Sequence, residues 1–245
     1  MSTSTKTVLF LGATGGVCLS ALRRSLAAGH TCIALCRTPS KLTNQLTTAE
    51  TSSPNLLIEQ GNAQDVDSLV RCLTKTASVD TVLSSIGGAF SISKMNIDDP
   101  KTCEVGMNAL VEAIRRTKLH PHIIAVSSTG ISDAGRDIPL PMVPLYHVLL
   151  KAPHKDKKNM ETALIKSGEP RWTIVRPSFY TDGPETDGQV RAGVEDLAGQ
   201  PKFESKAIGY SISRLDVGKW IFENLLRAGE ADVRKYTQKA VMITY

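Results

Sequence analysis

Long apolar runs are missing from the sequence. None approaches the roughly 20 consecutive apolar residues of a membrane-spanning helix, so we expect no membrane partner. The first residues, MSTSTK, are polar and lead directly into an apolar strand pattern, which is unlike a secretory signal. These features predict a globular protein of the cytoplasm.

An excess of one charge is also missing. The 29 Lys and Arg residues outnumber the 24 Asp and Glu residues by only five, and they are scattered along the chain. A nucleic-acid surface needs clustered basic residues, so we expect no nucleic-acid partner. A local basic pocket for an anionic small molecule fits the mild positive charge better.

Disulfide and metal-binding patterns are absent as well. The cysteines are odd in number and form neither a CxxC pair nor a His-paired spacing. We expect no metal site, and we expect buried, reduced thiols at all five positions: Cys18, Cys32, Cys36, Cys72 and Cys103.

What the sequence does contain is a regular alternation of short apolar runs and helical patterns. Six strands are predicted, at residues 8–12, 31–36, 56–61, 81–87, 122–128 and 172–177. Helical spacing follows most of them, up to a last helix near residues 215–228, and the chain closes with the apolar segment AVMITY. This order predicts a single Rossmann-type α/β domain over residues 1–245, a doubly wound parallel sheet with helices on both faces. Ligands of such sheets bind beyond the carboxyl ends of the strands.

The first strand is followed by the glycine-rich stretch GATGGVC, residues 12–18. Gly12 permits a tight turn, and Gly15 lets a phosphate approach the backbone. Cys18 occupies the place of the third glycine and is small enough to preserve the packing, although a redox-reactive thiol is the alternative. The stretch predicts a loop that binds the diphosphate of a dinucleotide through Gly12, Thr14, Gly15, Gly16 and Val17.

The end of the second strand indicates which dinucleotide. NAD-preferring folds place an acidic residue there to bind the ribose hydroxyls. This chain instead has Arg37, with Ser40 and Lys41 close behind. A guanidinium pairs well with a phosphate, so these residues favour NADP(H). The alternative is a solvated basic corner without a ligand.

At this point the chain resembles the atypical short-chain dehydrogenases/reductases, in particular the subgroup of flavin/biliverdin reductase B and the NmrA-like proteins. The likeness covers nearly the whole chain, and its most specific block is residues 156–184. It rests on the stretches GATGGVC, LCRTPSKL, GNAQDVDSL, AVSSTG, DKKNMETALIKSGEPRWTIVRPSFYTDGP and SRLDVGKWI. It implies a Rossmann domain that binds NADP(H) along the strand ends and is usually monomeric, a homodimer being the other option.

The resemblance also assigns residues by position. Lys157 matches a lysine that some relatives place near the nicotinamide ribose. The residues after each strand follow the cofactor from adenine, through ribose and diphosphate, to nicotinamide: Asn62 and Ala63; Ser85, Ile86 and Gly87; Ser127 and Ser128; and Pro177, Ser178 and Phe179.

The catalytic residues are less clear, because the Tyr-xxx-Lys pair of the larger superfamily is not matched. Tyr146 and Lys151 are five residues apart instead of four, and Lys157 is further still. The candidates are Ser128 as a donor to a substrate carbonyl, Lys157 at the nicotinamide ribose, and Tyr146 as a proton donor, with Tyr180 of similar weight. Each has a structural alternative: a backbone cap, a surface lysine or a packing residue. His154 is expected to be a surface or lid residue.

Two segments are predicted to cover the substrate, about residues 129–153 and 180–208. The first is rich in apolar residues, so a small, largely apolar substrate fits better than a highly charged one. Three functions remain open. They are an NADPH-dependent reductase of a flavin, quinone, enone or secondary metabolite, a non-redox isomerase or cyclase on the same scaffold, and an NADP(H)-sensing binding protein.

Overall fold

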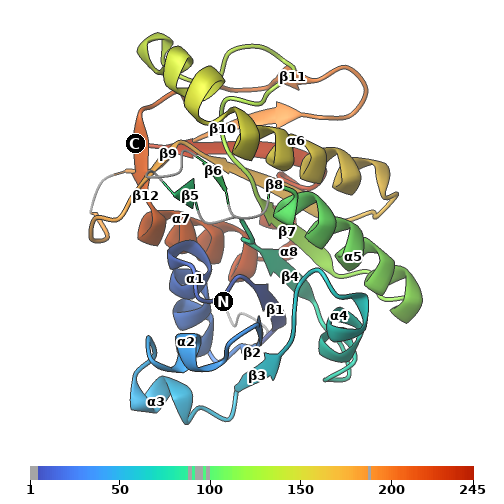
Figure 1. Ribbon diagram of the computed structural model, residues 1–245. Helices are drawn as coiled ribbons and strands as arrows, with labels where there is room; N and C mark the ends of the chain where they lie inside the picture. Colours follow the sequence, from blue (N-terminus) through green and yellow to red (C-terminus); the bar gives the residue numbers. More distant parts are fainter. Residues whose placement is uncertain (1–4, 88–89, 92–95, 98–99, 187–188) are drawn as a thin grey trace.

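A computed structural model describes residues 5–87, 90–91, 96–97, 100–186 and 189–245. Its centre is a nine-stranded sheet in the order β11-β10-β13-β8-β7-β4-β1-β2-β3 (Figure 1). From β13 to β3 all neighbouring strands are parallel, whereas β10 and β11 add an antiparallel edge. The strands are β1 Thr7–Leu11, β2 Thr31–Cys36, β3 Leu56–Gln60, β4 Thr81–Ser84, β7 His122–Val126, β8 Trp172–Pro177, β10 Arg191–Asp196, β11 Lys202–Phe203 and β13 Lys239–Thr244.

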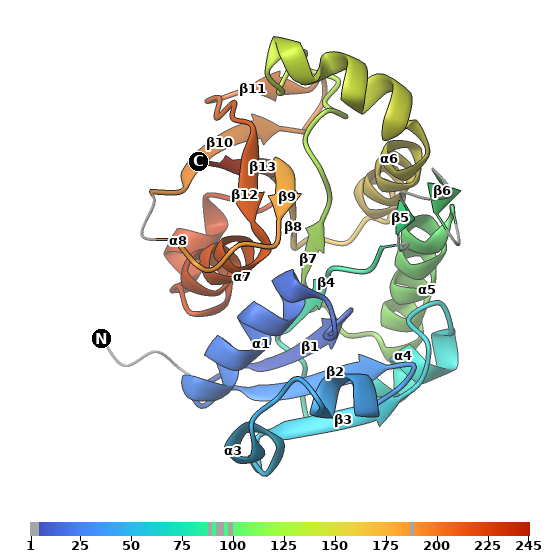
Figure 2. The same ribbon diagram turned by 60° about the vertical axis from the view of Figure 1, so that its left-hand side comes forward.

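Helices cover both faces of this sheet, as Figure 2 shows. They are α1 Gly16–Ala27, α2 Ser40–Thr43, α3 Thr48–Thr51, α4 Val66–Leu73, α5 Thr102–Thr117, α6 Lys151–Lys166, α7 Arg214–Ile221 and α8 Glu230–Arg234. Short 3₁₀ and π-helical turns lie at Leu140–Met142, Leu145–Leu149 and Phe222–Leu226. Two further strand pairs are β9 Phe179–Thr181 with β12 Ser211–Ser213, and β5 Phe90–Ser91 with β6 Asn96–Ile97.

Alternating side chains of the central strands supply two separate cores. In β1, Val8 and Phe10 pack on the side of α1 and α7, whereas Leu9 and Leu11 pack on the side of α4, α5 and α6. Because both faces are covered, a buried parallel strand is apolar throughout. The predicted Rossmann-type fold, a mostly parallel sheet between two helix layers, is confirmed. That the whole chain is one domain stays a prediction.

Three strands of the sheet were not predicted. The apolar segment near the end of the chain forms β13, which is inserted between β8 and β10. β10 and β11 lie within the segment 180–208 that was expected to cover the substrate, so much of that segment is sheet edge. β10 cannot be recognised from a hydrophobic pattern, because it contains a buried charged residue, Glu195, whose side chain pairs with Arg176 of β8.

The start of α6 overlaps the end of the segment 129–153, which the sequence predicts to cover the substrate. The helix begins at Lys151 and contains Pro153 in its first turn. Proline is tolerated there because the backbone N–H groups of a first turn have no intrahelical partner. The Asp156 carboxylate then accepts the backbone N–H groups of Cys103 and Glu104, both at 2.9 Å, and so joins α6 to the first turn of α5.

All five cysteines are buried and free of disulfide bonds, as the sequence predicts. Burial raises the pKa of the Cys36 and Cys103 thiols to about 11 and shifts that of Cys18 still higher. These thiols therefore stay protonated near neutral pH, which favours a packing role for Cys18 over a redox role. None of the described helices has the length and apolarity of a membrane span.

Candidate functional site: a groove along the strand ends

The glycine loop, residues 12–18, joins β1 to α1 in a conformation that only glycine permits. Gly12 has a φ of +91°, and a Cβ atom there would lie 2.8 Å from the carbonyl oxygen of Ser85. The Gly15 N–H donates to the Gly12 carbonyl at 2.9 Å. No side chain caps α1 and its first turn carries no acidic residue. The positive end of this helix is thus exposed for an anion.

A cavity of about 550 Å³ opens beyond the ends of β1, β2, β3 and β4. Its walls include most residues that the sequence assigned to the adenosine half of the cofactor: Gly12, Thr14, Gly15, Arg37, Lys41, Asn62, Ala63, Ser85, Ile86 and Gly87. Ser40 is not among them; it is exposed at the start of α2. Its role stays a prediction.

The basic corner of this cavity is not neutralised by the protein. Arg37 and Lys41 are both exposed, and neither forms an ion pair with any described carboxylate. No acidic residue stands among the described residues that line the cavity. The corner is therefore suited to a phosphate and not to a pair of ribose hydroxyls.

A second cavity of about 690 Å³ continues the first past Gly15, Ser85, Ile86 and Gly87. We call the two together the groove. The second cavity is lined by further candidates from the sequence: Gly16, Val17, Ser127, Ser128, Tyr146, Lys157, Ser178 and Phe179. Pro177 does not line it; its carbonyl accepts the backbone N–H of Thr129. Of the two predicted covering segments, the first contributes Tyr146, Leu150 and Pro153, and the second Tyr180 and Asp182.

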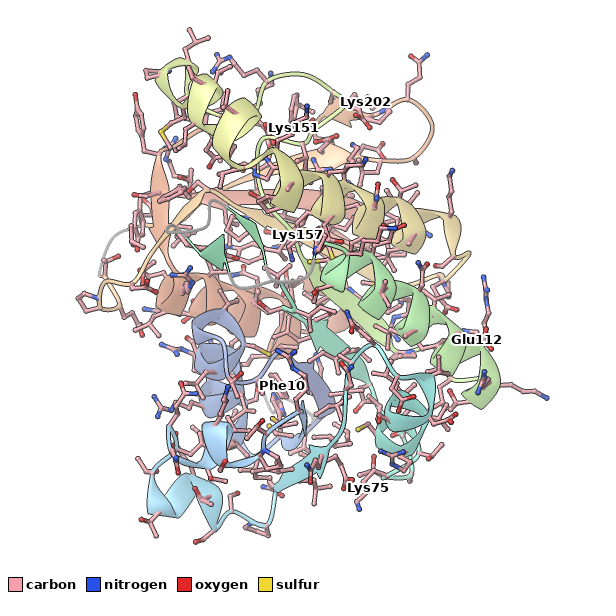
Figure 3. All side chains as sticks on the ribbon, viewed as in Figure 1. Phe10, Lys75, Glu112, Lys151, Lys157 and Lys202 are labelled. Atoms are coloured by element: carbon pink, nitrogen blue, oxygen red, sulfur yellow. The ribbon has the colours of Figure 1, made fainter. Side chains whose placement is uncertain are left out.

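Lys157 is held at the middle of the groove by two carbonyl groups. Its Nζ donates to the Ile86 oxygen at 2.9 Å and to the Val126 oxygen at 2.7 Å. Both acceptors lie just past or at the ends of parallel strands, β4 and β7, so the ammonium joins the two strand ends. Figure 3 shows Lys157 and Lys151 on the same helix. Lys151 is exposed and does not line the groove. An ammonium has three donors, and the third N–H of Lys157 faces the Cys103 thiol, a weak acceptor that a ligand oxygen can replace.

Ser128, His154 and Tyr146 form a cluster at the nicotinamide end. The Ser128 hydroxyl lies 3.3 Å from His154 Nε2 and 3.0 Å from the Thr129 carbonyl oxygen. The ring of Tyr146 contacts that of His154, with centroids 5.1 Å apart. The sequence placed His154 only as a lid or surface residue; its contact with Ser128 comes from helix α6 meeting the end of β7.

Tyr146 is a buried residue whose hydroxyl is already hydrogen-bonded. Only 3% of it is exposed, and burial raises its pKa although the hydroxyl bonds to Thr129 and to the Phe179 backbone. A raised pKa makes a phenol a poorer proton donor at neutral pH. This environment favours the packing role for Tyr146.

The groove contains one polar atom that lacks a protein partner. The Ser127 hydroxyl oxygen is buried and forms no hydrogen bond within the described residues, and Ser127 lines the second cavity. Buried hydroxyls are normally hydrogen-bonded. This unpaired oxygen, the space above Gly12 and the exposed basic corner together fit a bound dinucleotide.

Comparison with known proteins agrees with this geometry. Residues 12–228 match the family model described as NAD(P)H-binding. The chain belongs to the NAD(P)H-binding family. Reductase pytE of Aspergillus terreus is 39% identical over all of both chains. Oxidase pynE of Aspergillus niger is 31% identical, covering 92% of this chain and 95% of that protein.

Solved structures share the fold of this NAD(P)H-binding protein. A short-chain dehydrogenase/reductase from Veillonella parvula in complex with NADP has a TM-score of 0.73 and 18% identity, covering 99% of this chain and 95% of that one. ChuY, an anaerobillin reductase from Escherichia coli O157:H7, has a TM-score of 0.68 and 20% identity, covering 97% and 96%. The protein is therefore an enzyme of oxidoreductase type that uses NAD(P)H, as its resemblance to the atypical short-chain reductases implied.

Proposed function

We propose that the protein is an NADPH-dependent reductase of a small, largely apolar acceptor such as a flavin, quinone, enone or secondary metabolite. The observation that carries the preference for NADPH is the pair of cations Arg37 and Lys41, which flank the adenosine end of the groove. Neither has a carboxylate partner in the part of the chain that the structure describes. The apolar acceptor is supported by the other end, where Leu150, Pro153 and Phe179 line the second cavity. We further propose one domain, and a monomer acting in the cytoplasm.

In this proposal the bound NADPH supplies a hydride at its nicotinamide ring. The protein positions the cofactor and the acceptor and supplies a proton. Lys157 binds the nicotinamide ribose with the N–H that faces the Cys103 thiol in this structure. Ser128 donates a hydrogen bond to the acceptor oxygen. His154 in its imidazolium form, with Nε2 3.3 Å from the Ser128 oxygen, gives that oxygen a proton in turn, becomes the neutral imidazole and regains its proton from solvent. This arrangement dispenses with a tyrosine–lysine pair.

The proposal is tested by mixing the protein with NADPH and a panel of flavins, quinones and enones. Loss of NADPH absorbance that depends on the acceptor supports the reductase. Conversion of an acceptor while NADPH stays constant would indicate the isomerase or cyclase. Dinucleotide binding with neither reaction would indicate the sensor.

Replacing Arg37 by Ala should weaken NADPH binding about ten- to a hundredfold, because a charge-assisted contact to the 2′-phosphate is lost. NADH, which lacks that phosphate, should bind almost as before. Calorimetric titration of both dinucleotides measures the difference. Arg115→Ala is the matched control, since it removes the same charge from an exposed position of α5. Equal weakening of both dinucleotides by Arg37→Ala would refute the phosphate contact.

Replacing Ser128 by Ala should lower kcat for an identified acceptor about ten- to a hundredfold, the effect of losing a positioned proton donor. Tyr146→Phe should change kcat by less than about threefold, because its hydroxyl is engaged with Thr129 and Phe179. Steady-state rates at saturating NADPH make the comparison. A larger loss for Tyr146→Phe than for Ser128→Ala would reverse the two assignments.

A further inference from the structure

The sequence and the family comparison leave Arg214 without a role, yet it lies against the diphosphate end of the groove. Arg214 is the first residue of α7 and lines the second cavity together with Gly15 and Gly16. A Cβ atom on Gly16 would lie 3.2 Å from both Cβ and Cδ of Arg214. The stem of this arginine therefore packs on the first residue of α1, where a diphosphate would meet the exposed end of that helix.

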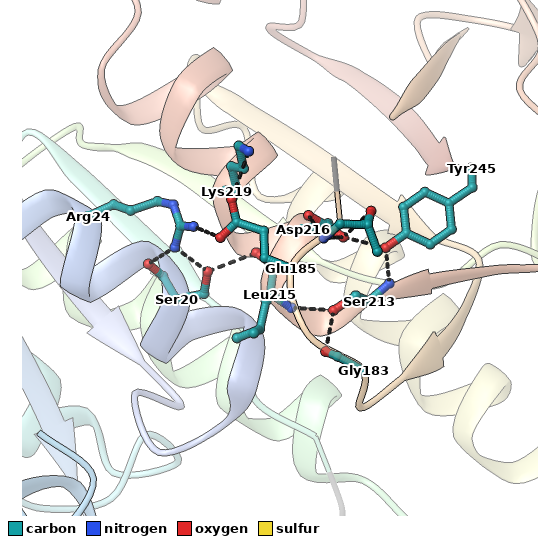
Figure 4. Close-up of polar contacts among 10 residues, drawn as sticks. Ser20, Arg24, Gly183, Glu185, Ser213, Leu215, Asp216, Lys219 and Tyr245 are labelled. Carbon is teal, nitrogen blue, oxygen red and sulfur yellow. Dashed lines mark hydrogen bonds and ion pairs between the residues drawn. The ribbon is translucent and has the colours of Figure 1, made fainter. Parts of the chain in front are cut away.

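Tight contact between α7 and α1 fixes this position. A Cβ on Gly218 would come within 2.4 Å of the Val17 carbonyl oxygen, so the two helices approach at a distance that only glycine allows. The Ser20 hydroxyl on α1 donates to the Leu215 carbonyl at 2.8 Å (Figure 4). Leu215 directly follows Arg214, so the backbone of the arginine cannot move away from Gly16 without breaking this contact.

On its other side, α7 holds the segment 182–186, which follows β9. The Ser213 hydroxyl donates to the Gly183 carbonyl at 3.0 Å, and the Thr186 hydroxyl donates to Asp216 at 3.0 Å. Glu185 pairs with Lys219 at 2.7 Å and with Arg24 of α1 (Figure 4). The segment is thus attached to both helices at the rim of the groove.

The ion pair that the Arg214 guanidinium forms in this structure is weak. The guanidinium pairs with Asp182, whose side chain is 85% exposed, and the Arg214 Cζ lies 4.7 Å from the centre of the Tyr180 ring. An ion pair open to solvent contributes little. A diphosphate carries more charge and offers oxygens to both guanidinium nitrogens. The Tyr180 ring supports the guanidinium plane without competing for its donors.

We infer that Arg214 is a cofactor-binding residue, which pairs with the diphosphate of the dinucleotide in place of Asp182. The glycine loop, GATGGVC, has no charged side chain, and Arg214 provides the positive charge. The inference rests on the proposed dinucleotide binding along the groove. It differs from the role of Arg37, because the diphosphate is common to NADPH and NADH.

Calorimetric titration of Arg214→Gln with both dinucleotides tests this. NADPH and NADH should both bind about tenfold more weakly than to the wild type, whereas Arg37→Ala should affect NADPH alone. ADP-ribose, which has the diphosphate but no nicotinamide, should lose affinity in parallel. Adenosine 2′-phosphate, which lacks the diphosphate, should bind unchanged. Arg214→Lys should recover part of the loss.

Two further variants distinguish a direct contact between Arg214 and the diphosphate from an indirect effect of Arg214 on the segment 182–186. Arg24→Gln removes a cation that attaches the same segment but does not line the groove, and it should leave both affinities unchanged. Asp182→Asn removes the competing carboxylate and should leave affinity equal or higher. A loss in Arg24→Gln as large as in Arg214→Gln would overturn the inference.

The outcomes for the wild type distinguish this inference from the proposed function. If the wild type binds neither dinucleotide, the proposed function itself fails. If the wild type binds both and Arg214→Gln binds them equally well, only the role of Arg214 is refuted. A loss of affinity of Arg214→Gln for adenosine 2′-phosphate would likewise refute the role of Arg214, since it would indicate a general disturbance of the groove.

Discussion

Replacement of Gly15 by Val is expected to reduce binding of NADPH and NADH by at least about a hundredfold, since a side chain would occupy the space where the diphosphate meets the backbone. Gly15 lines both cavities of the groove. Its own backbone, with φ −88° and ψ 143°, is available to any residue. A Cβ there would meet only the Gly12 carbonyl oxygen, at 3.3 Å.

The fold should therefore tolerate this variant. Valine is a poor residue at the position preceding a helix, which costs about 1 kcal/mol relative to a good cap. Thermal unfolding alongside calorimetry separates the two effects, and Gly15→Ala should give an intermediate affinity. Gly12→Ala provides the contrast, because its positive φ and the 2.8 Å contact with Ser85 disturb the fold itself. Full affinity in a folded Gly15→Val protein would refute the diphosphate site.

Replacement of Arg176 by Met should destabilise the protein by about 3–5 kcal/mol, the range found when one partner of a buried ion pair is removed. Arg176 is 1% exposed. Its Nε and Nη2 donate to the two oxygens of Glu161 at 2.9 and 2.7 Å, and its Nη1 donates to Glu195 at 2.5 Å. Without the guanidinium, two carboxylates would remain buried without a counter-charge. Arg176 thus binds two carboxylates within the fold.

Chemical denaturation at several pH values measures this loss and its cause. The loss should be smaller in acid, where protonated carboxyl groups need no counter-charge, than at neutral pH, where both are carboxylates. Glu195→Gln is the matched control, because it keeps an acceptor for Arg176, whose charge stays paired with Glu161, and leaves no carboxylate without a counter-charge. It should cost about 1–3 kcal/mol, the penalty of a buried amide N–H group without an acceptor. A loss equal to that of Arg176→Met would contradict the electrostatic explanation.

The sequence predicted the interior of the fold better than its edge. Runs such as VLFL and HIIAV are apolar throughout because parallel strands with helices on both sides are buried on both faces. β10 could not be found in this way, since Arg191, Glu195 and Asp196 give it a charged pattern. Its burial depends on Arg176, which lies on another strand.

The sequence predicted those residues of the candidate groove that directly follow a strand. Residues that follow a parallel strand lie at one edge of the sheet, so Gly12 could be assigned to the groove from its position. The family resemblance added Ser85 and Ser128, which follow other strands. His154 and Arg214 could be assigned in neither way. Each enters the groove from a helix, and the angle at which that helix packs is set by contacts such as Asp156 with the start of α5 and Gly218 with α1.

The placement of β13 governs the order in which the chain can fold. β13 lies between β8 and β10, both of which precede it in the sequence. The β10–β11 hairpin therefore has no neighbour in the sheet until β13 has been synthesised and inserted. The strands from β1 to β4, by contrast, pair over short separations and can assemble while the rest is still being made. Until β13 is in place, β8 therefore has an unpaired edge, the kind of edge at which a strand of another chain can pair.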